Sequence, residues 1–340
     1  MEHADMQSLQ DEVRLVSAPL QLVRQEIGRI VAGPEKLVER LLLALISDGH
    51  ALLEGVPGLA KTLAVKTLAQ TLQGSFSRLQ FTPDLLPADV IGTRIYNVRT
   101  GEFSTQKGPV FANIVLADEI NRAPAKVQSA LLEAMQERQI TIAGERFALP
   151  EPFLVMATQN PIEQEGTYPR PEAQLDRFMY KLRVDYPSRA EEKAVIERMA
   201  HPLPPAGAVA VATLDDVMNA RRLVDRIYID DKIVEYILDI VIATRPGAEC
   251  GLSARQEGVK LDDADGLLAF GASPRAGIAL SLAARGLALL NGRAYVLPQD
   301  VKELAPDVLR HRIVLSYEAE AEGIDADAVI GRLLAKLRTP

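Results

Sequence analysis

Residues 55–62 have the sequence Gly55-Val56-Pro57-Gly58-Leu59-Ala60-Lys61-Thr62. They follow a short apolar run, Ala51 to Leu53, and they precede a stretch from Lys61 to Leu72 with the apolar spacing of a helix. A glycine-rich turn between a strand and a helix, ending in Lys-Thr, matches the pattern of a phosphate-binding loop, although Ala60 replaces its last glycine. The stretch therefore predicts an α/β fold in which the first strand and helix bind a phosphate group.

The residues of this loop also predict how a chain of phosphate groups and Mg²⁺ would be bound. Backbone N–H groups of the turn and the helix N-terminus would point at the β-phosphate, where the helix dipole favours negative charge. Lys61 would contact the β- and γ-phosphates, and the Thr62 hydroxyl would hold Mg²⁺. An ordinary Gly/Pro turn before an amphipathic helix is the alternative, but the flanking strand and helix favour the phosphate-binding interpretation.

Two carboxylates follow a second apolar run. Ile114 to Ala117 predicts a buried strand, and Asp118 and Glu119 come directly after it. Since ligands lie beyond the carboxyl ends of parallel strands, this pair is expected in the same crevice as the loop. Asp118 would hold Mg²⁺, through water, and Glu119 would orient or deprotonate the attacking water.

A third strand, Phe153 to Ala157, leads into Thr158-Gln159-Asn160-Pro161 at the same edge. Asn160 could donate a hydrogen bond to the γ-phosphate or to the attacking water. On these residues alone, a turn residue before proline is the simpler interpretation of Asn160.

The remaining apolar runs indicate the rest of the architecture. Ser77 to Phe81 and Tyr180 to Val184 complete a set of five strands, separated mostly by helical stretches such as Pro124 to Glu137. Two segments with turn chemistry and alternating polarity predict inserted β-hairpins, at Ile95 to Val110 and Gln139 to Pro150.

The C-terminal part has a different pattern. A Pro/Ala/Gly-rich stretch at 201–208 indicates a boundary, so we expect a core over residues 1–200 and a second domain over 201–340. Apolar residues at helical spacing from Val234 to Ile242, Ile278 to Leu290 and Val301 to Leu309 predict that the second domain is all-α.

Composition excludes several classes of protein. The chain has 340 residues, of which 48% are hydrophobic, enough for two packed domains. Its net charge of −8 disfavours direct nucleic-acid binding, and no apolar run approaches the roughly 18 residues of a membrane span. The single cysteine, Cys250, cannot close an intrachain disulfide, and an acidic, polar N-terminus lacks the features of a secretory signal, so a cytoplasmic location is expected.

Taken together, the motifs closely resemble those of the MoxR family of AAA+ ATPases. The likeness extends in order from about Gly33 to Arg312. It is carried by five stretches, namely GVPGLAKT (55–62), ADEINRAP (117–124), ATQNP (157–161), PEAQLDRF (171–178) and GASPRA (271–276).

This resemblance implies the fold and the activity of the family. It implies an ATPase core with a parallel sheet in the order 5-1-4-3-2, two inserted hairpins, a helical lid and a homo-oligomeric ring, usually a hexamer. It also implies chaperone-like remodelling, maturation or activation of a client complex, often with a von Willebrand factor A domain partner. Since the chain has no DxSxS run of its own, that partner must be a separate chain.

The resemblance further assigns roles to individual residues. Lys61 and Thr62 become Walker A, Asp118 and Glu119 Walker B, and Asn160 sensor 1. Arg275 matches sensor 2, and its place after Ser273-Pro274 predicts the start of a helix. Arg177 matches an arginine finger supplied to a neighbouring subunit. On the residues alone, Arg177 is better explained by a surface ion pair with Asp176 or Glu172.

Two other functions fit parts of the pattern. The chain could be the ATPase subunit of a metal-chelatase-like complex, which shares the core motifs. It could also be a nucleotide-dependent scaffold with little turnover, although the presence of Glu119, Asn160, Arg177 and Arg275 argues against lost catalysis. Arg122 could contact a neighbouring nucleotide, but a solvent-exposed arginine is the simpler interpretation.

Overall fold

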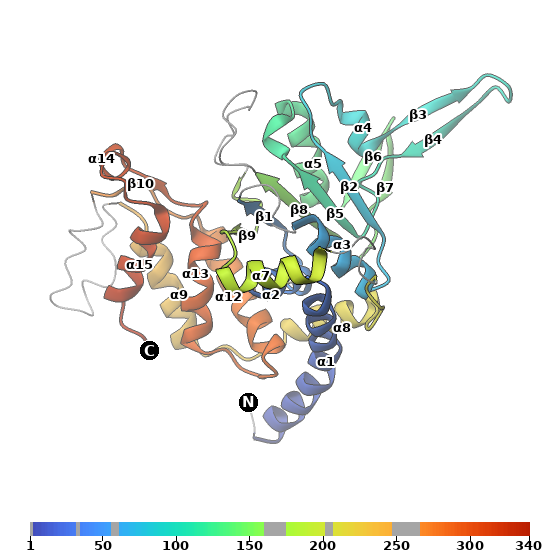
Figure 1. Ribbon diagram of the computed structural model, residues 1–340. Coiled ribbons are helices and arrows are strands. Elements are labelled where there is room, and N and C mark those ends of the chain that lie inside the picture. Colours follow the sequence, from blue (N-terminus) through green and yellow to red (C-terminus); the bar gives the residue numbers. More distant parts are fainter. Residues whose placement is uncertain (1–2, 32–34, 56–60, 160–174, 201–206, 247–265) are drawn as a thin grey trace. The chain divides into compact units, whose positions relative to one another are not determined.

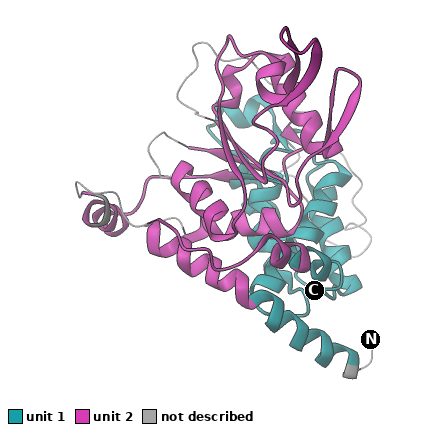
Figure 2. Ribbon diagram, turned by 90° about the vertical axis from the view of Figure 1, so that its right-hand side faces the viewer, with its two compact units in different colours: residues 1–17, 179–181, 220–340 teal, residues 18–178, 182–219 magenta. Residues whose placement is uncertain are grey.

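The computed structural model describes residues 3–31, 35–55, 61–159, 175–200, 207–246 and 266–340 (Figure 1). The chain divides into two compact units (Figure 2). Unit 1 comprises Met1–Ser17, Met179–Lys181 and Ala220–Pro340, and unit 2 comprises Ala18–Phe178 and Leu182–Asn219. Each unit is described separately below.

Unit 2 contains a five-stranded sheet in the order β2-β5-β8-β1-β9. The strands are β1 (Ala51–Glu54), β2 (Phe76–Gln80), β5 (Ile114–Asp118), β8 (Leu154–Gln159) and β9 (Tyr180–Arg183), the last of which begins with two residues of unit 1. The pairs β2–β5, β5–β8 and β8–β1 are parallel. The observed order, counted along the chain, is 5-1-4-3-2, so the predicted topology is confirmed.

Both faces of the central strands are buried, which explains why they lack polar alternation. The first four residues of β5 and the first five of β8 are all buried. One face packs against α5 (Ala125–Glu137), because alternate strand residues such as Val115 and Val155 share a core cluster with Leu131 and Met135. The ends of β1, β5 and β8 lie side by side beyond this core.

Both predicted hairpins are confirmed. The first is β3 (Gly92–Asn97) with β4 (Glu102–Lys107), and the second is β6 (Gln139–Ile142) with β7 (Glu145–Ala148). The second hairpin buries Ile140 and Ile142 in the core of unit 2. The first extends away from the sheet (Figure 1), and it exposes large apolar side chains at Tyr96, Val98 and Phe103.

Helices connect and cover these strands. They are α2 (Glu35–Ile46), α3 (Lys61–Thr71), α4 (Pro87–Ile91), the 3₁₀ turn η1 (Ile120–Arg122), α7 (Arg189–Met199) and α8 (Leu214–Val224). A helix of 28 residues, α1 (His3–Ile30), was not predicted; it contributes residues to both units, as α8 also does. None of the helices in the ranges given above is long and apolar enough to cross a membrane.

Unit 1 is helical, as predicted, with one addition. Its helices are α9 (Asp231–Ala243), α12 (Pro274–Leu290), α13 (Pro298–Leu309), α14 (Tyr317–Ala321) and α15 (Ala326–Lys336), and α12 packs on both α9 and α13. A small antiparallel ribbon joins β10 (Leu268–Phe270) to β11 (Val314–Leu315). Strands of three and two residues are too short to show a period in the sequence.

Candidate functional site

The site begins where β1 ends. Gly55 follows β1 and accommodates no side chain, because a Cβ there would lie 2.4 Å from the carbonyl oxygen of Val184. Lys61 begins α3, and its Nζ donates a hydrogen bond of 2.5 Å to the Gly55 carbonyl. Burial lowers the pKa of Lys61, and the nearby charge of Asp118 opposes that shift. The structure thus brings Lys61 to the ends of two strands, β1 and β5. Val56, Pro57, Gly58, Leu59 and Ala60 lie outside the described residues.

Asp118 is the last residue of β5, and both its carboxylate oxygens accept hydrogen bonds. The Thr158 hydroxyl donates to Oδ1 at 2.5 Å. Arg78, from the edge strand β2, donates to Oδ2 through Nη2 at 2.6 Å and through Nε at 3.2 Å. The carboxylate is therefore fixed on one side by a buried hydroxyl and on the other by a half-exposed guanidinium.

Glu119 has a left-handed backbone, with φ 55° and ψ 47°, a conformation that costs a residue with a Cβ about 1–2 kcal/mol. Hydrogen bonds hold it there. Its backbone N–H donates to Thr158 Oγ1 at 2.9 Å. Gln80 Nε2 and Arg122 Nη1 each donate to Glu119 Oε2, also at 2.9 Å. Arg122, expected to be a solvent-exposed arginine, is 40% exposed and pairs with Glu119.

One hydroxyl thus connects the two acidic residues. Thr158 is only 4% exposed, and it donates to the side chain of Asp118 while accepting from the backbone of Glu119. A hydroxyl can play both parts because it carries one donor and two acceptor sites. Thr158 therefore couples the Asp118 carboxylate to the backbone of Glu119.

The isosteric substitution Thr158→Val tests this coupling. Valine keeps the shape but leaves the Glu119 N–H without its acceptor, so the free energy of unfolding is expected to fall by about 1–3 kcal/mol. Urea unfolding of the whole chain measures the change. Thr158→Ser keeps the hydroxyl and should lose less; equal losses for the two variants would show that the hydroxyl contributes nothing.

Sequence reasoning missed three residues of this arrangement: Arg78, Gln80 and Thr158. Arg78 and Gln80 lie on the same face of β2, two residues apart, and Gln80 is directly opposite Asp118 in the parallel register. The available signal was their alternation with the buried Leu79. Asn160 lies outside the described residues, but β8, which leads to it, lies between β5 and β1.

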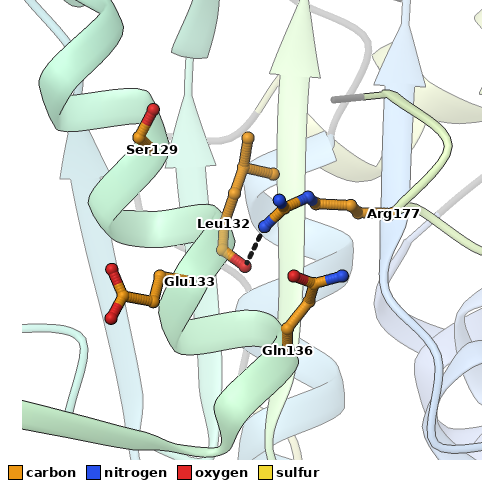
Figure 3. Close-up of a pocket in the computed structure, with 5 residues that line it drawn as sticks. All are labelled: Ser129, Leu132, Glu133, Gln136 and Arg177. Carbon is orange, nitrogen blue, oxygen red and sulfur yellow. Dashed lines mark hydrogen bonds between the residues drawn. The ribbon is translucent and has the colours of Figure 1, made fainter. Parts of the chain in front are cut away.

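Arg177 lies in unit 2, at a cavity of about 240 Å³ beside α5 (Figure 3). Its Nη1 donates a hydrogen bond of 3.4 Å to the carbonyl oxygen of Leu132. Three further side chains of α5 line the cavity: Ser129, Glu133 and Gln136. The guanidinium therefore lies at a polar surface depression.

Arg275 belongs to unit 1, whereas the other described candidates belong to unit 2. Its local structure is as the sequence predicted: Ser273 is the N-cap of α12, Pro274 is in the first turn, and the Arg275 backbone N–H donates to Ser273 Oγ at 3.3 Å. Its side chain therefore starts from the first turn of a helix.

The donor groups fit a nucleotide-bound Mg²⁺ better than a metal held by protein alone. Among the residues with described side chains, no group of three or more His, Cys, Asp or Glu side chains could hold a metal. Mg²⁺ usually takes one or two carboxylates together with phosphate oxygens and water. The Asp118 carboxylate and the Thr62 hydroxyl are hard oxygen donors of that kind.

Comparisons with known proteins show the family to which the chain belongs. The family model for the ATPase family associated with various cellular activities (AAA) matches residues 50–180, and the AAA lid domain model matches residues 262–333. Over 315 residues the chain is 52% identical to Chaperone MoxR1 of Mycobacterium tuberculosis, covering 93% of this chain and 81% of that protein.

Two further relatives extend over nearly the full length. Protein MoxR of Paracoccus denitrificans is 32% identical over 92% of this chain and 94% of its own. A crystal structure from Cytophaga hutchinsonii is 46% identical, covers 99% of both chains and superposes with a TM-score of 0.89. On this similarity and on its fold, the chain belongs to the MoxR family of AAA+ ATPases.

Proposed function

We propose that this chain hydrolyses ATP to ADP and phosphate at the edge of its sheet, using Lys61, Asp118 and Glu119. The observation that carries the proposal is the arrangement around Thr158, in which one buried hydroxyl binds the Asp118 carboxylate and the Glu119 backbone, and the charge of Lys61 interacts with that of Asp118. A lysine at a helix N-terminus binds phosphates, and a positioned carboxylate can take a proton from water. These are the groups that phosphoryl transfer to water requires.

Each residue has a separate part in this reaction. Lys61 binds the β- and γ-phosphates, and Thr62 and Asp118 hold Mg²⁺, which supplies positive charge against the transferring phosphoryl group. Glu119 orients the attacking water and accepts its proton. Asn160 donates a hydrogen bond to the γ-phosphate or to that water.

Two arginines complete the site. Arg275, from a lid over residues 201–340, contacts the phosphates bound by the core over residues 1–200. Arg177 acts on the nucleotide of a neighbouring copy, so the working form is a homo-oligomeric ring, usually a hexamer in this family. The place of Arg177 at a surface cavity supports this, because a group that works on a neighbour must be accessible from outside.

The reaction drives chaperone-like remodelling of a client protein complex in the cytoplasm, with a separate von Willebrand factor A domain protein as partner. The naming of MoxR1 as a chaperone supports the first part. The first hairpin, β3 with β4, is suited to touch a client because it exposes Tyr96, Val98 and Phe103 far from the sheet.

Titration of phosphate release with Mg²⁺ tests the ATPase proposal. The parent should release no phosphate in excess chelator and should respond to Mg²⁺. In Arg78→Ala the half-saturating Mg²⁺ concentration should fall by about two- to fivefold, because the guanidinium no longer competes with Mg²⁺ for Asp118. An exposed ion pair of this kind contributes about 1 kcal/mol or less. If the parent released no phosphate at any Mg²⁺ concentration, the ATPase proposal would be contradicted. If the half-saturating Mg²⁺ concentration of Arg78→Ala equalled that of the parent, Arg78 would not compete with Mg²⁺ for Asp118.

A further inference from the structure

Strand β9 is at the edge of the sheet, and two arginines bind the carbonyls of Lys181, within β9, and of Met179, the residue before it. Val184 N–H donates to Glu54 in β1, so even-numbered residues of this segment face the sheet. Neighbouring residues in a strand point their backbone groups to opposite sides, so the carbonyl of Lys181 faces the open edge. Unpaired groups on an edge strand need other partners.

The partners of these two carbonyls come from the end of α13, within unit 1. Arg312 Nη1 donates to the Met179 carbonyl at 3.1 Å and also to the carbonyl of Val308 in the last turn of α13. Arg310 Nη1 donates to the Lys181 carbonyl. One guanidinium thus ties the helix end to the strand.

Both guanidiniums are buried and held in place. Arg310 is 8% exposed and pairs with Asp307 at 2.8 Å and with Asp327 at 2.9 Å. Arg312 is 9% exposed. A buried, planar guanidinium with several fixed acceptors has little freedom to move, so it fixes the carbonyls that it binds.

Arg177 lies two residues before Met179. The residue between them, Phe178, is 1% exposed in the core cluster of unit 2. The backbone that carries Arg177 is therefore held by a buried ring on one side and by the arginine-bound carbonyls on the other.

We propose that Arg312, assisted by Arg310, positions Arg177 for its action on the neighbouring subunit's nucleotide. The proposal rests on the proposed function of Arg177. Arg312 is a positioning residue, because it acts through the backbone at Met179. Loss of its hydrogen bonds frees the strand and shifts the Arg177 guanidinium, and a shift of about 1 Å can reduce turnover about 10²-fold.

The test uses Arg312→Met in the full chain. Turnover should fall by about 10²-fold, while the Kd for ATP stays the same. Arg293→Met is the matched control, since Arg293 also pairs within unit 1, with Asp300 at 2.6 Å, and binds Tyr295 rather than β9. It should lose stability but keep its turnover.

Mixed oligomers then separate positioning from a structural role. Arg312→Met chains are mixed with Glu119→Gln chains, which have an intact Arg177 but cannot activate water. A site is complete when its phosphate-binding loop comes from an Arg312→Met chain and its Arg177 comes from a Glu119→Gln chain. In an equal mixture that assembles at random, head to tail, about a quarter of the sites meet this condition. The mixture should therefore regain up to about a quarter of the parental turnover. No gain over the separate variants would overturn the proposal.

A parallel mixture distinguishes the two possible failures. A mixture of Arg177→Ala chains with Glu119→Gln chains should regain activity in the same way. If it does not, the proposal that Arg177 acts on the nucleotide of a neighbouring chain is wrong. If Arg312→Met does not fold, Arg312→Lys replaces it, because lysine keeps the charge and can reach one of the two carbonyls. The same gain on mixing is expected from it, and the absence of that gain would equally overturn the proposal.

Discussion

Glu119→Gln is expected to lower the rate of ATP hydrolysis by about 10²- to 10⁴-fold, the range that a positioned general base contributes. The substitution removes the group that accepts the proton from water in the proposed reaction. It keeps the size of the side chain and an oxygen that can accept from Gln80. ATP affinity should therefore stay within a few-fold of the parent. Phosphate release and equilibrium binding of labelled ATP measure the two effects separately.

A matched control shows whether the loss is specific to this carboxylate. Glu197 in α7 is exposed and forms an i,i+4 pair with Lys193 at 3.6 Å, so Glu197→Gln removes an equal charge in the same unit. Such pairs contribute only about 0.3–0.5 kcal/mol, and turnover should not change. Parental turnover in Glu119→Gln would mean that another group activates the water.

Arg177→Ala is expected to lower turnover by about 10³- to 10⁵-fold, as loss of an arginine finger does in related NTPases. ATP binding should persist, because in the proposed reaction the phosphates are bound by Lys61 of the same chain as the Walker motifs. The guanidinium is needed only when charge develops in the transition state, so the loss should appear in kcat and not in the Kd for ATP. Single-turnover phosphate release alongside binding makes this distinction.

Arg189→Ala is the control for this variant, because Arg189 is an exposed arginine in the first turn of α7. It should leave kcat unchanged. If Arg177 instead forms a surface ion pair, the kcat of Arg177→Ala should also be unchanged. If the turnover of Arg177→Ala equals that of Arg189→Ala, the ion-pair interpretation is correct and Arg177 is not an arginine finger.

Much of the fold could be predicted because its signals are local. The glycine-rich pattern at 55–62 comes between an apolar run and a stretch with helical spacing, and apolar runs such as Ile114 to Ala117 identify the central strands without long-range information. The order of those strands came from the family resemblance. Helix α1 was missed, although its buried residues Leu9, Val13, Leu20 and Ile27 recur at helical spacing.

The candidate site was predictable only in part, for a physical reason. Asp118 and Glu119 follow a buried strand, where a carboxylate is conspicuous. Arg78 and Gln80 alternate with buried residues on an edge strand, as any solvent-facing pair does, and only the register with β5 brings them to the acidic pair. Arg312 likewise gives no signal in the sequence, because its partner at Met179 is 133 residues away.

In the proposed reaction, a second copy of the chain completes the site. Light scattering and phosphate release, measured together over a range of protein concentrations with ATP and Mg²⁺, test it most directly. If Arg177 acts in a neighbouring subunit, ATP should induce a ring, and turnover per chain should rise as the ring forms. A monomer whose turnover per chain is the same at every concentration would contradict it.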